Sequence, residues 1–311
     1  IVSLYIWILV AITLLFTKYN AKYFKWKKIL WEKALFMKVF KYALVVLLGA
    51  QAWTILGQID MQMVIFILGT YDAWYYTNYL SIIGIPFIII WPIFALLFPV
   101  FSEMHAKAQH GKIKTIKHVF TKNFMVVAIA MNILFFVFSE IIAYILFGEK
   151  FITSWVILKY SILFLVFNFL LQINFNILAG IGKVKERFHI ILAAIILNFI
   201  MNIIFINIMW VYGAALATWF GWIFIYLMSE KVLWKDFRVA YDYRFILKNI
   251  LSFTLLWWWL YMFVVPLFEN IGRMQSFWYM FVLTIIYFTL FAFINLKESK
   301  IFIWEIKKLR N

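Results

Sequence analysis

Residues 42–68 read YALVVLLGAQAWTILGQIDMQMVIFIL and contain one charged residue, Asp60. A run this long and apolar is typical of a helix that crosses the hydrocarbon core of a bilayer. The rest of the chain has the same character, since 67% of its 311 residues are hydrophobic and 14% are charged. A soluble fold could not hide 36 Phe, 16 Trp and 17 Tyr without exposing large apolar patches. The composition therefore predicts an integral membrane protein.

Similar apolar runs recur on both sides of this stretch, interrupted by only four Pro and eleven Gly. We expect an all-α, polytopic transmembrane helical bundle of about nine spans. The predicted spans cover residues 1–17, 42–68, 73–101, 121–147, 154–179, 189–209, 213–230, 249–268 and 276–296.

The Lys and Arg residues fall on alternate connections between these spans. The exceptions are Lys150 and Arg273 on the opposite side and Lys159 within a span. Because basic connections stay in the cytoplasm, this pattern predicts a cytoplasmic C-terminus and an external residue 1 in the cell membrane. The net charge of +16 is thus interpreted as a topology signal, and no nucleic-acid partner is expected.

The chain begins at Ile1 inside an apolar run, with no Met and no signal peptide. We therefore expect a fragment that lacks an odd number of upstream helices. The connection 18–41 carries eight Lys residues among aromatic ones. It is interpreted as an ordinary positive-inside anchor or as a helix lying on anionic lipid.

Asp60 and its neighbouring glutamines give the second predicted span two polar faces. Gln51, Gln58 and Gln62 are spaced by seven and four and share one face, whereas Asp60 points about 200° away. A central Asp costs roughly 2.5–3.5 kcal/mol on insertion scales, so it should face protein or water. Contact with a substrate or cation and a hydrogen bond to an adjacent helix both stay open for Asp60.

Lys159 is the intramembrane cation of the predicted spans. It lies on the span after that of Glu140, at a similar distance from the connecting turn, so a salt bridge between them is the favoured hypothesis. The alternative is that Lys159 faces a cavity and attracts a phosphate.

Amide side chains accumulate on two further spans. They form one face with Asn168, Gln172 and Asn176, and a pair one turn apart with Asn198 and Asn202. Amides at this spacing join helices or contact sugar hydroxyls in a wet cavity. Together with Gln51, Gln58, Asp60 and Lys159, they are the candidate substrate-cavity residues.

Catalytic patterns are not found. The four His residues lie on cytoplasmic connections without metal-ligand spacing, and neither a P-loop nor a GxSxG motif occurs. We predict no catalytic residue, no metal site and no cofactor.

Several short motifs occur in a characteristic order and resemble the polysaccharide (O-antigen type) flippases of the multidrug/oligosaccharidyl-lipid/polysaccharide exporter superfamily. The motifs are Gly57-Gln58-Ile59-Asp60, Leu97-Phe98-Pro99-Val100-Phe101-Ser102-Glu103, Phe147-Gly148-Glu149-Lys150-Phe151, Asn176-Ile177-Leu178-Ala179-Gly180-Ile181-Gly182-Lys183 and Tyr212-Gly213-Ala214-Ala215-Leu216-Ala217-Thr218.

The resemblance implies a domain organisation. Residues 1–17 would be the last helix of an otherwise missing N-terminal lobe, and 18–41 the basic connection. Residues 42–230 would form the six-helix C-terminal lobe, and 231–311 two additional helices with a basic tail. The main phosphate-binding residues would lie in the missing helices.

The resemblance also implies a membrane transporter (flippase) rather than an enzyme. It would export a lipid-linked (isoprenoid pyrophosphate) oligosaccharide by alternating access, for cell-surface polysaccharide biosynthesis. Expected partners are membrane lipid, this substrate, and glycan polymerase and glycosyltransferases. One alternative is a cation-coupled multidrug exporter of the same fold, with Asp60 binding Na⁺ or H⁺. Another is a membrane-embedded glycan-modifying enzyme, which the short outer connections disfavour.

Overall fold

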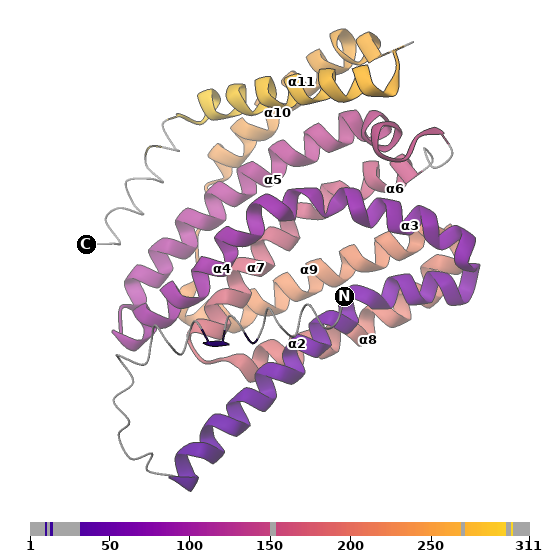
Figure 1. Ribbon diagram of the computed structural model, residues 1–311. Coiled ribbons are helices and arrows are strands. Elements are labelled where there is room, and N and C mark those ends of the chain that lie inside the picture. Colours follow the sequence, from indigo (N-terminus) through magenta and orange to yellow (C-terminus); the bar gives the residue numbers. More distant parts are fainter. Residues whose placement is uncertain are drawn as a thin grey trace. The chain divides into compact units, whose positions relative to one another are not determined.

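The computed structural model describes residues 10, 13–14, 32–149, 154–268, 271–296 and 300, and no strand occurs among them. The chain divides into two compact units, Ile1–Leu44 and Val45–Asn311. Apart from the start of the first long helix, the features described below belong to the second unit. The elements are α2 (Lys33–Leu68), α3 (Thr70–Ile83), α4 (Ile85–Ala106), α5 (His110–Phe147), α6 (Ser154–Ser161), η2 (Ile162–Phe164), α7 (Leu165–Gly180), α8 (Val184–Met209), α9 (Val211–Phe237), α10 (Tyr243–Phe263), η3 (Val265–Phe268) and α11 (Arg273–Ile294) (Figure 1).

Every predicted span from 42–68 onward coincides with described helices, which confirms the all-α, polytopic fold class. Among the described residues, six helices are individually long and apolar enough to cross a bilayer, and two bent helix pairs bring the total to as many as eight. The first bent pair is Thr70–Ile88, which comprises α3 and the start of α4, with Ile90–Ala106, the rest of α4, at 54°. The second is α6 with α7, bent by 57°. The predicted span 1–17 lies outside the described residues.

Two helices begin earlier than the hydropathy pattern predicts. α5 starts at His110 rather than near residue 121, so Lys112 and Lys117 lie on the helix instead of a connection. α2 starts at Lys33, so the end of the predicted connection 18–41 also belongs to a helix, and residues 18–31 are outside the described part. Lys is a good helix former, so both helices extend beyond their apolar stretches into the headgroup region.

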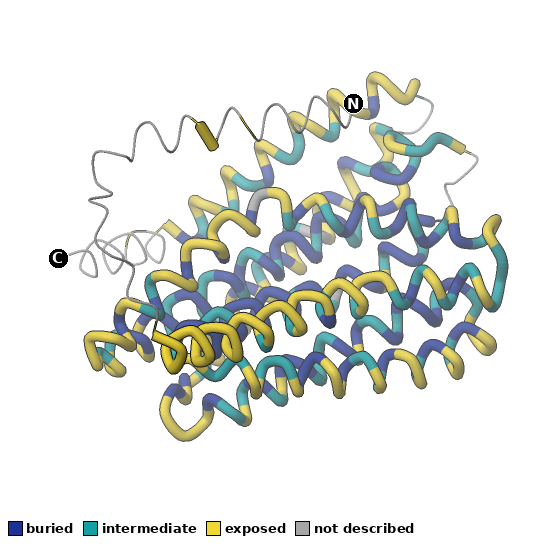
Figure 2. The backbone as a smooth tube through the Cα atoms, turned by 60° about the horizontal axis from the view of Figure 1, so that its bottom comes forward, coloured by how far each residue is buried: buried dark blue, intermediate teal, exposed yellow. Residues whose placement is uncertain are grey.

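The buried core of the second unit lies along α5, α7 and α9, whereas α10 and α11 are largely exposed (Figure 2). Small residues set the closest helix contacts. A Cβ on Gly213 of α9 would lie 2.1 Å from the Phe205 carbonyl oxygen, and one on Gly180 of α7 would lie 2.7 Å from the Phe101 Cβ. A larger side chain would therefore force α8 from α9, or α4 from α7.

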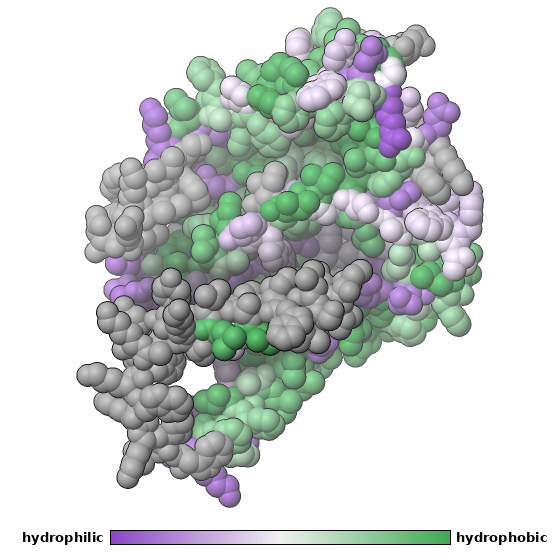
Figure 3. All heavy atoms as spheres, in the orientation of Figure 1, coloured by the Kyte–Doolittle hydropathy of each residue, from purple (hydrophilic) through white to green (hydrophobic). Residues whose placement is uncertain are grey.

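Large apolar side chains are exposed over the surface of this unit. Phe66 is 86% exposed, and Ile88 and Phe293 are each 75% exposed. In the view of Figure 3, apolar side chains cover much of the face that is drawn in colour. Exposure on this scale fits a surface surrounded by lipid.

Candidate functional site

Asp60 is a buried carboxylate where α2 meets α8 and α9, and only 4% of the residue is exposed. Asn198 and Asn202, one turn apart on α8, donate amide hydrogens to its Oδ1 atom at 2.9 and 2.7 Å. Thr218 on α9 donates its hydroxyl to the Oδ2 atom at 2.6 Å. Three neutral donors from two helices thus bind the carboxylate.

A fourth helix reaches the same cluster through Tyr76 on α3. Its side chain is 1% exposed, and its hydroxyl lies 3.3 Å from Thr218 Oγ1. The Thr218 hydroxyl is also 3.1 Å from the Ala214 carbonyl oxygen, a local contact common for Thr within helices. Asp60 therefore joins α2, α3, α8 and α9 in a single polar cluster.

The charge of this cluster is uncompensated, because Asp60 forms no ion pair with any residue that the structure describes. Within the cluster Asn202 Nδ2 also donates to Asn198 Oδ1 at 2.9 Å, while Asn202 Oδ1 is buried without a partner. Carboxylate, hydroxyl and amide oxygens are ligands for hard cations. The described residues contain no group of three or more His, Cys, Asp and Glu that could hold a metal ion. The chemistry at Asp60 thus suits a proton or a hard monovalent cation.

The glutamines of α2 point away from this cluster. Gln51, Gln58 and Gln62 are all exposed, whereas Asp60 and Val64 are buried on the opposite side of the helix. The two polar faces that the spacing predicts are therefore present: one packs against α8 and α9, and the other is open.

The remaining candidate amides lie on α7 and do not join the Asp60 cluster through any hydrogen bond in the described residues. Asn168 and Gln172 are each 6% exposed, and Asn176 donates to the Gln172 backbone oxygen at 2.8 Å. Asn168 Oδ1 is buried without a partner. Their proposed contact with a substrate stays a prediction.

Lys159 does not form the predicted salt bridge. Its Nζ atom lies over the Phe136 and Trp155 rings, 5.1 and 5.2 Å from their centroids. Glu140 is exposed, and no ion pair joins it to Lys159 in the described part of the chain. The similar distance of both residues from the turn was insufficient, because it sets their depth and leaves their orientation around each helix undetermined.

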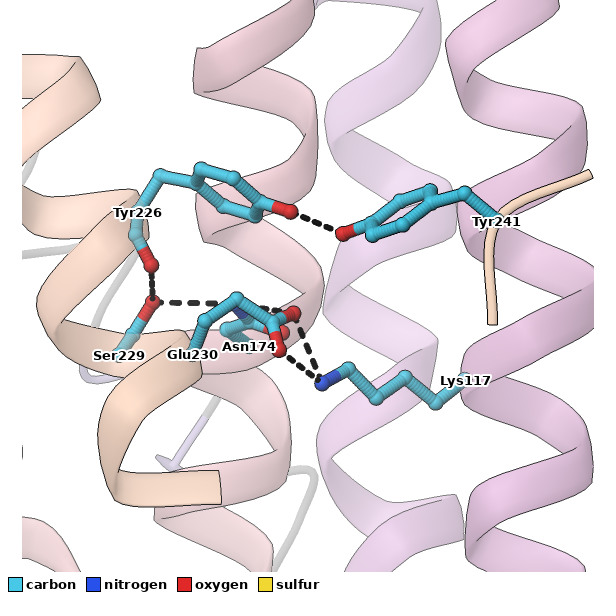
Figure 4. A network of polar contacts seen from close by, with 6 residues as sticks. All are labelled: Lys117, Asn174, Tyr226, Ser229, Glu230 and Tyr241. Atoms are coloured by element: carbon cyan, nitrogen blue, oxygen red, sulfur yellow. Dashed lines mark hydrogen bonds and ion pairs between the residues drawn. The ribbon is translucent and has the colours of Figure 1, made fainter. Parts of the chain in front are cut away.

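A second polar network, which the sequence did not predict, surrounds Lys117. Figure 4 shows this side chain pointing from α5 toward Glu230 on α9, with Nζ 2.8 Å from Oε1 and 3.0 Å from Oε2. Asn174 on α7 donates to Glu230 Oε1 at 3.2 Å and to Ser229 Oγ at 3.0 Å. Lys117 is 1% exposed, although its place in a basic stretch suggested a surface residue.

The network continues toward the segment between α9 and α10. The hydroxyls of Tyr226 and Tyr241 are hydrogen-bonded, and burial raises the pKa of Tyr241 to about 12. Tyr241 therefore stays neutral at physiological pH. The next residue, Asp242, accepts a hydrogen bond from the Phe245 backbone N–H and pairs with Lys122 at 3.4 Å. These contacts attach the start of α10 to α5 and α9.

No protein-family model matches the chain. It is 27% identical over 292 residues to an uncharacterized membrane protein of Methanocaldococcus jannaschii, a match that covers 91% of this chain and 55% of that protein.

Among solved structures, the fold is similar to that of the lipid II flippase MurJ in an inward closed conformation. The TM-score is 0.57 and the identity is 16%, over 76% of this chain and 51% of the flippase. The chain thus spans about half the length of both proteins. The likeness assigns this chain a MurJ-like helical fold.

Proposed function

We propose that this chain forms part of a flippase that moves a lipid-linked oligosaccharide across the membrane by alternating access. The observation that carries the proposal is the division of α2 into an open glutamine face and a buried carboxylate face. Gln51 and Gln58 are exposed on the first, and Asp60 is bound by α8 and α9 on the second. In a flippase of this fold, α2 would contact both the substrate and a coupling ion.

The glutamine face would contact the polar part of the lipid-linked oligosaccharide. Exposed amides at hydrocarbon depth are unfavourable against lipid and favourable against sugar hydroxyls, which both donate and accept hydrogen bonds. We assign Gln51 and Gln58 to the wall of a central passage and Asn168, Gln172 and Asn176 to its extension. Lys159, held between two aromatic rings, is the cation available for a phosphate.

The Asp60 cluster is assigned to cation coupling. A carboxylate stabilised only by neutral donors gains most from a bound positive charge, and Thr218 and the two asparagines supply further oxygen atoms. Binding Na⁺ or H⁺ there would change the contacts between α2, α8 and α9, which are the contacts that a rocking lobe must rearrange. Asn198 and Asn202 thus serve the ion rather than the sugar.

The domain division belongs to the same proposal. Residues 42–230 would form one lobe and 231–311 two additional helices, with a second lobe supplied by the part of a longer protein upstream of residue 18. Glycan polymerase and glycosyltransferases are the expected functional partners, and the cytoplasmic side would be the basic one.

The test is Asp60→Asn in the full-length protein, expressed in a strain that lacks it. The amide removes the only charge of the cluster, and losing a charged partner costs on the order of 3 kcal/mol, roughly a hundredfold in cation affinity. We expect Na⁺-dependent thermal stabilisation to disappear and surface glycan to fall at equal protein abundance. Asp242→Asn, outside the cluster, is the matched control.

Two results would redirect the assignment. Normal surface glycan in the Asp60→Asn strain would remove Asp60 from the export cycle. Unchanged glycan in a strain lacking the whole protein, together with sensitivity to cationic drugs, would favour a cation-coupled multidrug exporter, for which Asp60 is equally suited.

A further inference from the structure

The two bends in the bundle lie side by side. α3 packs on α6 and α4 packs on α7, so the halves of one bent span match the halves of the other (Figure 1). Near the bends, the Phe87 and Phe169 rings contact each other edge to face at 5.6 Å. We call the first two half-helices the α3–α6 pair and the other two the α4–α7 pair.

Both bends have local causes that make them flexible. The first bend lies between Ile88 and Ile90, within α4, and Pro92 in the next turn has no backbone N–H to donate to the Ile88 carbonyl oxygen. The α6–α7 bend contains the single 3₁₀ turn η2, a geometry that often marks a hinge when it interrupts a longer helix. Because backbone hydrogen bonds are weakened at both bends, the α3–α6 pair can tilt on the α4–α7 pair as a unit.

α9 contacts this hinge region through two consecutive residues. Thr218 lies 3.3 Å from the Tyr76 hydroxyl of α3, and the Trp219 ring stacks on Phe164 of η2 with centroids 4.4 Å apart. Thr218 is also the residue that donates to Asp60. Neighbouring residues of α9 therefore contact the Asp60 cluster and the second bend.

The donor and acceptor of each hydrogen bond between Tyr76, Thr218 and Asp60 follow from counting the hydroxyl hydrogens. Thr218 has one hydroxyl hydrogen, and Asp60 Oδ2 at 2.6 Å takes it, so the Tyr76 hydroxyl donates to Thr218 Oγ1. A cation held by Asp60 and Thr218 would repel that hydrogen. The Ala214 carbonyl oxygen, at 3.1 Å, is ready to accept it instead. The Thr218 hydroxyl then turns about its Cβ–Oγ1 bond, and its oxygen, drawn toward the cation, changes its contact with Tyr76.

We propose that Tyr76 is a positioning residue that transmits occupancy of the Asp60 cluster to the α3–α6 pair. The inference rests on the proposed cation coupling. When the ion binds, Thr218 turns and Tyr76 follows, and the α3–α6 pair tilts at the paired bends. Tyr76 contributes its hydroxyl to this series of hydrogen bonds and does not supply the charge that binds the ion.

The experiment measures the tilt directly in the full-length protein in lipid nanodiscs. This sequence contains no Cys, so spin labels can be attached at Trp74→Cys on α3 and Leu96→Cys on α4, both exposed positions across the first bend. A second pair, Trp74→Cys with Tyr160→Cys, lies within the α3–α6 pair. Distances are recorded by pulsed electron resonance in saturating NaCl and in KCl, and Na⁺-dependent thermal stabilisation is measured on the same samples.

We expect Na⁺ to shift the distance across the bend and to leave the distance within the α3–α6 pair unchanged. Tyr76→Phe, which removes only the hydroxyl, should abolish the shift while Na⁺ still raises the melting temperature. Tyr287→Phe is the matched control, because it removes an equally buried hydroxyl that donates to the Ala130 carbonyl oxygen at 2.8 Å. Pro92→Ala is a second variant, since it restores a backbone N–H that can donate to the Ile88 carbonyl oxygen, and the stiffer bend should reduce the shift.

The outcomes separate this inference from the function on which it rests. A shift in Tyr76→Phe as large as in the unmodified protein overturns the role of Tyr76, and a full shift in Pro92→Ala overturns the hinge. Stabilisation by Na⁺ without any shift in the unmodified protein also overturns the inference and leaves the ion site standing. If Na⁺ produces neither effect there, the cation coupling itself is wrong and the inference falls with it.

Discussion

Lys117 places an ammonium group inside the bundle, where Glu230 and Asn174 are its neighbours from α9 and α7 (Figure 4). Such a pair is compensated only while both charges remain, because each partner offsets the desolvation of the other. The Asp60 carboxylate differs, since neutral donors surround it and its charge is left available. The Lys117–Glu230 ion pair therefore joins helices, whereas the Asp60 carboxylate is suited to bind a cation.

The difference predicts the stability of Lys117 variants. Lys117→Met should destabilise the protein by up to about 3 kcal/mol, since it leaves the partly buried Glu230 without its counter-charge, and adding Glu230→Leu should recover most of the loss. The measurement is denaturant or thermal unfolding in a mild detergent. Lys107→Met, which breaks the exposed Lys107–Glu103 pair, is the control and should leave the stability nearly unchanged. A double variant no more stable than Lys117→Met would contradict this account.

At the scale of elements, α10 and α11 are held on α5 by polar contacts at three depths. Arg273, at the start of α11, donates from Nε to the Ile145 carbonyl oxygen and from Nη2 to that of Leu146, both at 2.6 Å. Tyr287 reaches the Ala130 carbonyl oxygen farther along α5, and Asp242 pairs with Lys122 near its beginning. The two helices therefore follow α5 in any movement.

Arg273 caps the end of α5 with a forked contact that Lys cannot reproduce. We expect Arg273→Lys and Arg273→Ala to accelerate amide hydrogen exchange at the end of α5 and the start of α11, with a larger effect for Ala. Exchange in α8 and α9 should not change. Equal exchange in Arg273→Lys and the unmodified protein would show that charge alone is sufficient.

Asp242 caps α10, and the Phe245 backbone N–H and then Lys122 hold the pKa of its carboxyl below the usual range. A lowered pKa stabilises the fold at neutral pH, and this contribution is lost as pH falls through the lowered value, below about pH 4. Hydrogen exchange at residues 243–247 should therefore accelerate only on strong acidification. Asp242→Asn keeps a capping oxygen and should remove the pH dependence, whereas Asp242→Ala should raise exchange at every pH. A titration near pH 6 would refute this assignment.

For the whole molecule, the orientation in the membrane depends on which side each helix end lies. The structure brings the start of α5, the start of α8 and the end of α9 to one end of the bundle, and these segments carry many of the described Lys and Arg residues (Figure 1). By the positive-inside rule, we expect that end to face the cytoplasm.

Tags test this orientation directly. An epitope inserted after Gly148 or before Arg273 should be accessible on intact cells, whereas one between Arg238 and Asp242 should become accessible only after permeabilisation. Expression at equal level and retention of Na⁺-dependent stabilisation are the controls for correct folding. Labelling with the reverse pattern would invert the bundle, and the proposed direction of transport with it.

The sequence alone determined the helical membrane fold and the ranges of the spans from residue 42 onward, because hydrocarbon requires long apolar helices whatever their neighbours are. It also placed Asp60 and the glutamines on opposite faces of α2, since helical spacing is a local property. It left open whether Asp60 contacts a substrate or cation or forms a hydrogen bond to an adjacent helix.

Only the tertiary structure decided which side chains meet. Asn198, Asn202 and Thr218 converge on Asp60 from helices more than a hundred positions away. Lys117 turned inward to Glu230, and Lys159 turned to aromatic rings rather than to Glu140. The physical reason is that composition and periodicity determine the depth and face of a residue on its own helix, whereas a partner depends on how the helices rotate and pack against one another.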